Sequence, residues 1–504
     1  MPRISEDNPN FKWWAFGTIA FGTFISVISH ASVLVALPTI AEHFEAPLST
    51  VQWVVISETL AIAVLILPMG RLGDLVGRRR IYVIGFAVFT LAAALAGSSR
   101  WTNLTTLLVA KVGQGVGSAM IQGNAVAMII STFPERERGK ALGANLSVVG
   151  LGAIIGPALG GILVSIWGWQ AVFLMNIPTG LITIAATFIV LGGSQVGMVA
   201  KPAERIRFDW PGAVLSGATL MLFLLLVGNG HQLGWTSPVV IVGVLCLLAI
   251  FSGFVWWELR IEEPMLDLRL FRSKLVSLGI AAGWISFLGT SATRFMMPFY
   301  LQAVLGMSPR DMGLLMIPPA LSLVILGPLS GQLSDKFGWR KFTLSGLALS
   351  ASASFILAAW LSEDFPVGWI VAMLMLQSAG TGLFNSPNNS SIMSAVDRSR
   401  YGVISALTNL TRNSANIVSI ALATTIVVTV MGIMGVEPNL QAVSPEVSGA
   451  FIAGLRWTFG LMGSILVLGI VISYFRGDRP PPAQETLRPA ASEGGQERYS
   501  GSRR

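Results

Sequence analysis

The chain has 504 residues, of which 53% are hydrophobic and only 12% are charged, and its mean hydropathy is +0.69. Soluble domains carry about a quarter charged residues, so this composition excludes a soluble protein and indicates an integral membrane protein. The net charge of +8 would favour a nucleic-acid partner in a soluble chain. In a membrane protein it reflects topology instead, and we expect no nucleic-acid partner.

Fourteen apolar runs reach the length of about 20 residues that a membrane-spanning helix requires. We therefore expect an all-α integral membrane protein. Its even number of spans leaves both termini on the same side of the membrane. The predicted spans lie near 13–38, 49–69, 81–98, 104–131, 141–165, 171–192, 211–229, 238–257, 275–302, 308–330, 341–361, 368–390, 402–433 and 449–474.

The basic residues are distributed unevenly between the two sides of these spans. Of the 33 lysines and arginines, 27 fall on the side of the termini, and only Arg100 and Arg310 fall on the other side. Because cytoplasmic loops carry the excess of basic residues, this distribution predicts that both termini are cytoplasmic. We expect a multi-pass protein of the inner or plasma membrane.

A short charged string occurs twice, each time directly after an apolar run. The first copy, G-R-L-G-D-L-V-G-R-R-R, runs from Gly70 to Arg80, and the second, G-Q-L-S-D-K-F-G-W-R-K, from Gly331 to Lys341. The repeat indicates internal duplication, with the string after the second helix of each six-helix bundle if spans seven and eight form an inserted hairpin. The expected regions are a cytoplasmic N-terminus (1–12), an N-terminal bundle (13–192), a linker (193–210), the hairpin (211–257), a second linker (258–274), a C-terminal bundle (275–475) and a disordered cytoplasmic tail (476–504).

The repeated string also carries candidate gating residues. Asp74 lies near Arg78 at the cytoplasmic end of a helix, where a charge-assisted contact between bundles would hold one conformation. The alternative is that the basic residues only fix the orientation of the chain. The remaining candidates in the two copies are Gly70, Gly77, Asp335 and Arg340.

The fifth span contains the small-residue run G-A-I-I-G-P-A-L-G-G, with Gly152, Gly156, Pro157 and Gly160. Small residues at every fourth position allow close helix packing, and the proline removes one backbone donor and bends the helix. We assign these four residues to gating. Ordinary helix packing is the alternative interpretation.

One acidic residue, Glu58, lies deep in a predicted span. A charge at that depth is costly, which favours a functional, inward-facing group such as a proton carrier. The alternative is a structural ion pair with an embedded cation. His30, in the first span, titrates in a useful range and is the second candidate for proton coupling, although a hydrogen-bonded contact between helices explains it equally well.

Polar residues recur at helical spacing inside several spans, and they are expected to face a watery cavity because lipid would penalise them. Three basic residues among them against the single Glu58 favour an anionic or zwitterionic amphiphile, provided that all three face the cavity. The candidate substrate and cavity residues are Ser29, Trp53, Lys111, Gln114, Gln122, Arg294, Asn385, Asn409, Arg412 and Asn413.

These motifs together resemble a known family. The two charged strings are similar to the signature between helices two and three of the major facilitator superfamily, and the glycine-proline run resembles its antiporter motif. The string from Lys111 to Ala119 resembles the motif of the fourth helix, with Lys where Arg is usual. The string W-Q-A-V-F-L-M-N-I-P-T-G, from Trp169 to Gly180, and the fourteen spans resemble the drug:proton antiporter branch.

The resemblance covers roughly residues 12–475 and implies two pseudo-symmetric six-helix bundles, a central cavity and alternating access. The chain departs from this branch at Ser29, which stands where the first span usually has an acid. We expect a transporter that exports an amphipathic organic compound, coupled to proton influx. The alternatives are a dedicated carrier of an anionic metabolite or lipid, and a membrane sensor that does not transport.

No nucleotide-binding loop, metal-spaced cluster or nucleophile constellation is present in the sequence, so we expect no enzyme activity, no cofactor and no metal. The expected partners are a small-molecule substrate, protons and the lipid bilayer, and the expected functional unit is a monomer.

Overall fold

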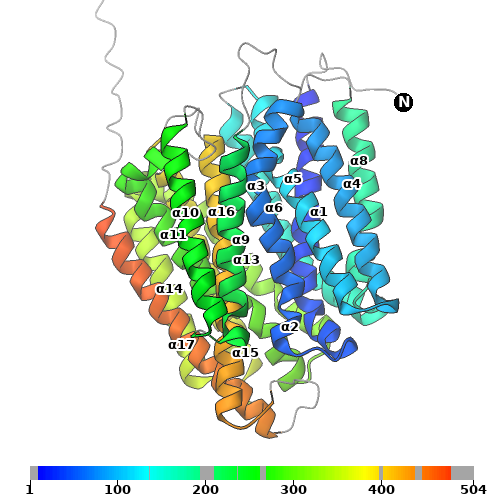
Figure 1. Ribbon diagram of the computed structural model, residues 1–504, viewed down its shortest axis with the longest axis vertical. Coiled ribbons are helices and arrows are strands. Elements are labelled where there is room, and N and C mark those ends of the chain that lie inside the picture. Colours follow the sequence, from blue (N-terminus) through cyan, green and yellow to red (C-terminus); the bar gives the residue numbers. More distant parts are fainter. Residues whose placement is uncertain are drawn as a thin grey trace, which may run out of the picture.

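The computed structural model describes residues 10–134, 137–192, 209–234, 236–261, 268–396, 401–437 and 445–477. Within these residues the regular structure is helical throughout, and fourteen helices are long and apolar enough to cross a membrane, which confirms the predicted number (Figure 1). The first half contains α1 (Phe11–His43), α2 (Leu48–Val51), α3 (Trp53–Val76), α4 (Arg78–Ser98), η1 (Ser99–Trp101), α5 (Leu104–Thr132), α6 (Arg138–Trp167), α7 (Ala171–Leu174) and α8 (Asn176–Leu191).

The rest of the chain continues the same pattern. Two helices, α9 (Trp210–Leu233) and α10 (Pro238–Arg260), separate the halves. The second half contains η3 (Leu268–Arg272), α11 (Lys274–Phe299), the π-helical turn η4 (Tyr300–Val304), α12 (Pro309–Leu315), α13 (Ile317–Phe337), α14 (Trp339–Trp360), α15 (Val367–Met393), α16 (Tyr401–Ile433) and α17 (Pro445–Phe475).

The second, sixth and tenth predicted spans are each built of two α-helices rather than one, and the second divides at Gln52, between α2 and α3. The helix α7 gives way to α8 at Met175, and α12 gives way to α13 at Met316. Prolines follow the junctions at Met175 and Met316, namely Pro178 after the first and Pro318 and Pro319 after the second. A proline cannot donate the backbone bond to the carbonyl four residues earlier, so each helix restarts at these positions.

The helices form two six-helix bundles with a hairpin inserted between them, as predicted. The helices α1 to α8 pack mainly with one another, and so do α11 to α17. Figure 1 shows the first group in blue and cyan on one side and the second in green to red on the other. The hairpin helix α9 packs against α10, α3 and α16, and α3 also contacts α16. The hairpin therefore covers one seam between the bundles.

The bundles touch closely at the end of the molecule opposite the start of α1. A Cβ atom built on Gly161 of α6 would lie 2.3 Å from the carbonyl oxygen of Pro309, and one on Gly313 would lie 2.5 Å from that of Pro157. Nearby, the Gln302 side chain donates a hydrogen bond to the carbonyl of Val35 at 2.9 Å. These contacts join α6 and α1 of the first bundle to η4 and α12 of the second, so this end of the seam is closed.

Arg476, which directly follows α17, contacts two other helices of the second bundle at the end opposite the closed seam. Its guanidinium is buried, donates to the side chains of Asn388 and Ser391, and lies 4.7 Å from the centroid of the Trp339 ring. Burial lowers the pKa of Arg476 to about 10, so the group remains a cation at neutral pH. The contacts fasten the end of α17 to α14 and α15.

The Arg476→Ala substitution is expected to lower the stability of the protein by about 1–3 kcal/mol, because Asn388 and Ser391 lose their buried, charged donor. The measurement is the apparent thermal unfolding midpoint of the purified protein in detergent. Arg260→Ala is the control, since Arg260 lies over the Trp256 ring at 4.4 Å but on the exposed surface of α10. Equal midpoints for the two variants would contradict the anchoring role.

Candidate functional site

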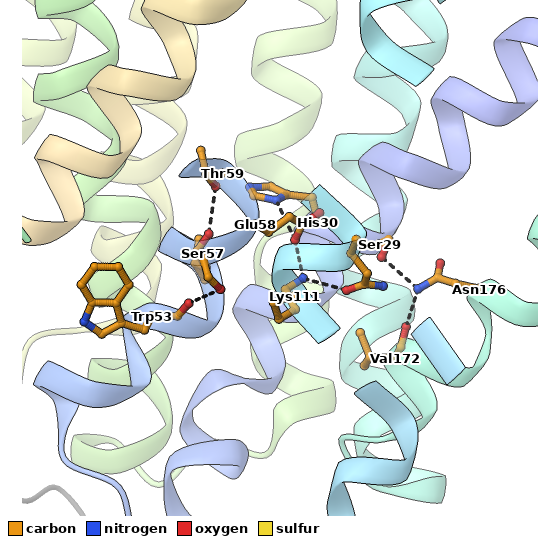
Figure 2. A network of polar contacts seen from close by, with 11 residues as sticks. Ser29, His30, Trp53, Ser57, Glu58, Thr59, Lys111, Val172 and Asn176 are labelled. Carbon is orange, nitrogen blue, oxygen red and sulfur yellow. Dashed lines mark hydrogen bonds and ion pairs between the residues drawn. The ribbon is translucent and has the colours of Figure 1, made fainter. Parts of the chain in front are cut away.

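A buried ion pair joins α3 to α5 inside the N-terminal bundle. Glu58 is 3% exposed and Lys111 is fully buried, and the Lys111 ammonium donates a hydrogen bond to the Glu58 carboxylate (Figure 2). The same ammonium donates to the Gln114 side-chain oxygen at 3.1 Å and lies 5.6 Å from the centroid of the Phe173 ring. The two charges therefore compensate each other out of contact with solvent.

The sequence around Lys111 explains how the two helices come close enough. Gly115 lies one turn further along α5, and a Cβ atom there would approach the backbone oxygen of Glu58 to 2.5 Å and Ala61 to 2.6 Å. Only a residue without a side chain fits at that crossing. The string K-V-G-Q-G thus carries both the cation and the glycine that brings the cation to its partner.

His30 of α1 approaches the same carboxylate from another direction. Its Nδ1 atom lies 3.8 Å from a Glu58 carboxylate oxygen. The His30 side chain is 36% exposed, whereas that of Glu58 is 4% exposed. His30 therefore lies between the buried ion pair and solvent, and Figure 2 shows the three side chains converging from three helices.

Ser29, which stands beside His30 in the sequence, belongs to a different contact. Its hydroxyl accepts a hydrogen bond from the Asn176 side chain at 2.9 Å, and Asn176 also donates to the carbonyl of Val172 at 3.2 Å. Ser29 therefore joins α1 to α8. Asn176 was not among the predicted site residues, although it lies in the string that indicated the transporter branch.

Three further cavity candidates lie apart from the ion pair. The Trp53 ring points away from Glu58 (Figure 2) and packs under the hairpin, where a Cβ atom on Gly228 of α9 would lie 3.3 Å from it. Gln122 is half-buried two turns beyond Gln114 on α5, and Asn385 is half-buried in α15. The structure does not bring these residues to the Glu58 site.

A second polar cluster lies between α11 and α16 of the C-terminal bundle. Arg294 donates to the Ser291 hydroxyl at 3.4 Å, and Arg412 donates to the Asn409 side-chain oxygen at 2.9 Å. Asn413 is 6% exposed, and its amide nitrogen has no hydrogen-bond partner among the described residues. The structure therefore places four of the predicted residues on two contacting helices, away from Lys111.

The candidate gating residues of the first charged string pair within one bundle. The carboxylate of Asp74, at the end of α3, lies 2.7 Å from the guanidinium of Arg78, at the start of α4, and both side chains are partly exposed. Gly77 links α3 to α4 with a φ of 105°, which favours glycine. A Cβ atom on Gly70 would lie 3.2 Å from the carbonyl oxygen of Gly123, so this glycine packs α3 against α5.

In the second string, the backbone of Asp335 lies in α13, but its side chain is outside the part of the chain that the structure describes. The Arg340 guanidinium lies 4.3 Å from the centroid of the Tyr474 ring, at the end of α17. Among the described side chains, the first copy of the string forms an ion pair and the second a cation–π contact.

The glycine run of α6 packs on α1. Cβ atoms built on Gly152, Gly156 and Gly160 would approach α1 to 3.0, 2.6 and 2.7 Å respectively, and the Ser32 hydroxyl donates to the Gly156 carbonyl at 2.7 Å. The carbonyl of Pro157 faces α12 instead. The helix α6 therefore packs against α1 of its own bundle on one face and against α12 of the opposite bundle on another face.

The sequence matches the family model of the Major Facilitator Superfamily over residues 19–230 and again over 210–420. The chain belongs to the major facilitator superfamily. The riboflavin transporter RibZ of Clostridioides difficile is 32% identical over 78% of this chain and 83% of its own length. The multidrug resistance protein Stp of Mycobacterium tuberculosis (strain H37Rv) is 31% identical over 84% of this chain and 77% of its own length.

A solved structure shares the major facilitator fold. It is a bacterial homologue of the human lysosomal transporter Spinster, in an inward-facing and unoccupied conformation, with a TM-score of 0.66 at 16% identity over 93% of this chain and 97% of that chain. Family membership and fold together identify this chain as a multi-pass membrane transporter rather than an enzyme.

Proposed function

We propose that this major facilitator protein exports an amphipathic organic compound by alternating access, driven by proton influx through Glu58, His30 and Lys111. The relatives named as a multidrug resistance protein and a riboflavin transporter support an organic cargo. The distribution of basic residues supports cytoplasmic termini, and with that topology the closed end of the seam would lie outside. Because one chain supplies both bundles, we propose a monomer as the functional unit.

The contact between His30 and the buried ion pair carries the proposal of proton coupling. Glu58 and Lys111 sum to zero charge, so the charge of the three-residue site is set by the third member, His30. Histidine is the side chain that ordinarily changes charge between pH 5 and 8. A site that alternates between zero and one positive charge as it changes access carries one proton per cycle. That charge is worth about 2.3 kcal/mol per 100 mV of membrane potential.

The closed seam supports the direction of access. Contacts between α6 and α12 and between η4 and α1 close the end opposite the termini. His30 and Arg294 nevertheless have exposed side chains, although both lie in the interior of long helices. We infer that solvent reaches them from the end that bears the termini, which makes this conformation inward-facing.

The test measures accumulation of riboflavin and of the cationic dye ethidium in proteoliposomes, with and without an imposed proton gradient. The paired substitution Glu58→Gln with Lys111→Met leaves no unpaired charge in the bundle. It is expected to reduce gradient-driven accumulation about tenfold or more, while gradient-independent exchange of the same compound continues.

Glu42→Gln is the matched control, because Glu42 is an exposed acid near the end of α1. Accumulation that still follows the gradient in the paired variant would show that protons do not pass through Glu58 and Lys111. Binding of a compound without flux under any gradient would favour a sensor instead of a transporter.

A further inference from the structure

The charge of the C-terminal bundle differs from that of the N-terminal bundle. In the N-terminal bundle the embedded cation Lys111 is paired with Glu58. In the C-terminal bundle, Arg294 and Arg412 form no ion pair with any residue that the structure describes. Two uncompensated guanidiniums inside a membrane protein are costly, and this is where a functional role is the default interpretation.

The two arginines share one space between their helices. Arg294 follows buried Thr293 and precedes buried Phe295, yet its own side chain is exposed. It lies on the same face of α11 as Ser291, which hydrogen-bonds to Asn416 of α16. Arg412 lies one helical turn before Asn416 on α16, so the contact between Ser291 and Asn416 brings the faces that carry Arg294 and Arg412 together.

The groups in this region that have few hydrogen-bond partners are N–H donors, which require acceptors. A guanidinium has five N–H donors, and each arginine uses its donors on one neutral oxygen among the described residues, the hydroxyl of Ser291 or the amide oxygen of Asn409. The buried amide nitrogen of Asn413 adds a further donor without a partner among these residues. Buried donors are normally satisfied, so the Asn413 nitrogen in particular lacks an acceptor, which a ligand would supply.

We propose that the cargo is an organic anion whose oxyanion group binds between Arg294 and Arg412, with Asn413 as an additional donor. This inference rests on the proposed export function and names its substrate class. An anion relieves the repulsion between the two arginines, whereas a cation would add to it. Trp284 and Phe287 lie partly buried on the same face of α11 as Arg294 and supply apolar contact surface for the organic part.

The test compares binding of two matched pairs of fluorescent compounds to the purified full-length protein in detergent. Flavin mononucleotide differs from riboflavin by a phosphate, and fluorescein differs from rhodamine 123 mainly in charge. The anionic member is expected to bind about tenfold or more tightly in at least one pair. Arg294→Gln and Arg412→Gln should each remove that preference, and Arg294→Lys, which retains the charge, should keep part of it.

Arg456→Gln is the control, because Arg456 donates to the backbone carbonyls of Ala358 and Ala359 at the end of its helix and lies outside the cluster. The proposal is overturned if neither pair favours its anion, if the preference survives both glutamine substitutions, or if chloride at equal concentration displaces the organic anion. The paired variant at Glu58 and Lys111 should retain anion binding. Proton-driven flux that persists in the paired variant, with intact anion binding, would therefore contradict the coupling and not the substrate class.

Discussion

The Lys111→Met substitution is expected to destabilise the protein by about 3–5 kcal/mol, because it leaves the Glu58 carboxylate buried without its counter-charge. Glu58 is 3% exposed and cannot reach water without disturbing the contact between α3 and α5 at Gly115. Methionine has nearly the volume of lysine, so the loss is electrostatic and not a packing defect. The measurement is the thermal unfolding midpoint of purified protein in detergent.

Adding Glu58→Gln to Lys111→Met is expected to restore most of the lost stability, since replacing both members of a buried ion pair is often neutral. The control is Lys12→Met. Lys12 contacts Glu137 at 2.5 Å, but both side chains are partly exposed, and such a surface pair contributes about 0–1 kcal/mol. A Lys111→Met midpoint equal to that of the control, or a paired variant no better than Lys111→Met alone, would contradict the stabilising role of the pair.

The fold follows from the sequence because a membrane-spanning helix requires a long apolar run, and fourteen such runs were present. The breaks at Met175 and Met316 did not follow from hydropathy, since apolar residues continue through both junctions. The prolines after each break were visible in the sequence. Prolines also lie inside unbroken helices, such as Pro38 in α1 and Pro387 in α15, so their presence alone did not locate a junction.

Glu58 and Lys111 were each candidates because each is a charged residue inside a predicted span. The sequence did not show that the two side chains form an ion pair with each other. Their contact depends on two helices crossing at Gly115, and such a crossing is a property of tertiary packing. The same limit applies to Trp53. Trp53 was a predicted cavity residue, and in the structure α9, which comes from the inserted hairpin, lies against its ring. Segments distant in sequence decide which side chains share a site.

The Gly161→Ala substitution is expected to displace the protein from its present conformation. A Cβ atom at Gly161 would lie 2.3 Å from the carbonyl oxygen of Pro309, which is backbone and cannot rotate away. The two bundles must therefore separate at this end, and a transporter that needs this closure once per cycle should lose about tenfold or more of its flux.

The separation is measurable as a longer distance between nitroxide labels at Trp101 and Trp360, two exposed residues at this end of the two bundles, after replacement of the single cysteine, Cys246. Gly327→Ala is the control, since a Cβ atom there would meet nothing within 4 Å. An unchanged label distance together with unchanged flux in Gly161→Ala would contradict the proposed closure.

The neighbouring glycine separates closure between bundles from packing within one bundle. A Cβ atom on Gly160 would lie 2.7 Å from the Ser32 backbone of α1, which belongs to the same bundle as α6. Gly160→Ala should therefore lower the unfolding midpoint and leave the label distance unchanged, whereas Gly161→Ala should change the distance. Two adjacent residues of one motif then affect different equilibria, because one packs α6 within its bundle and the other packs it across the seam.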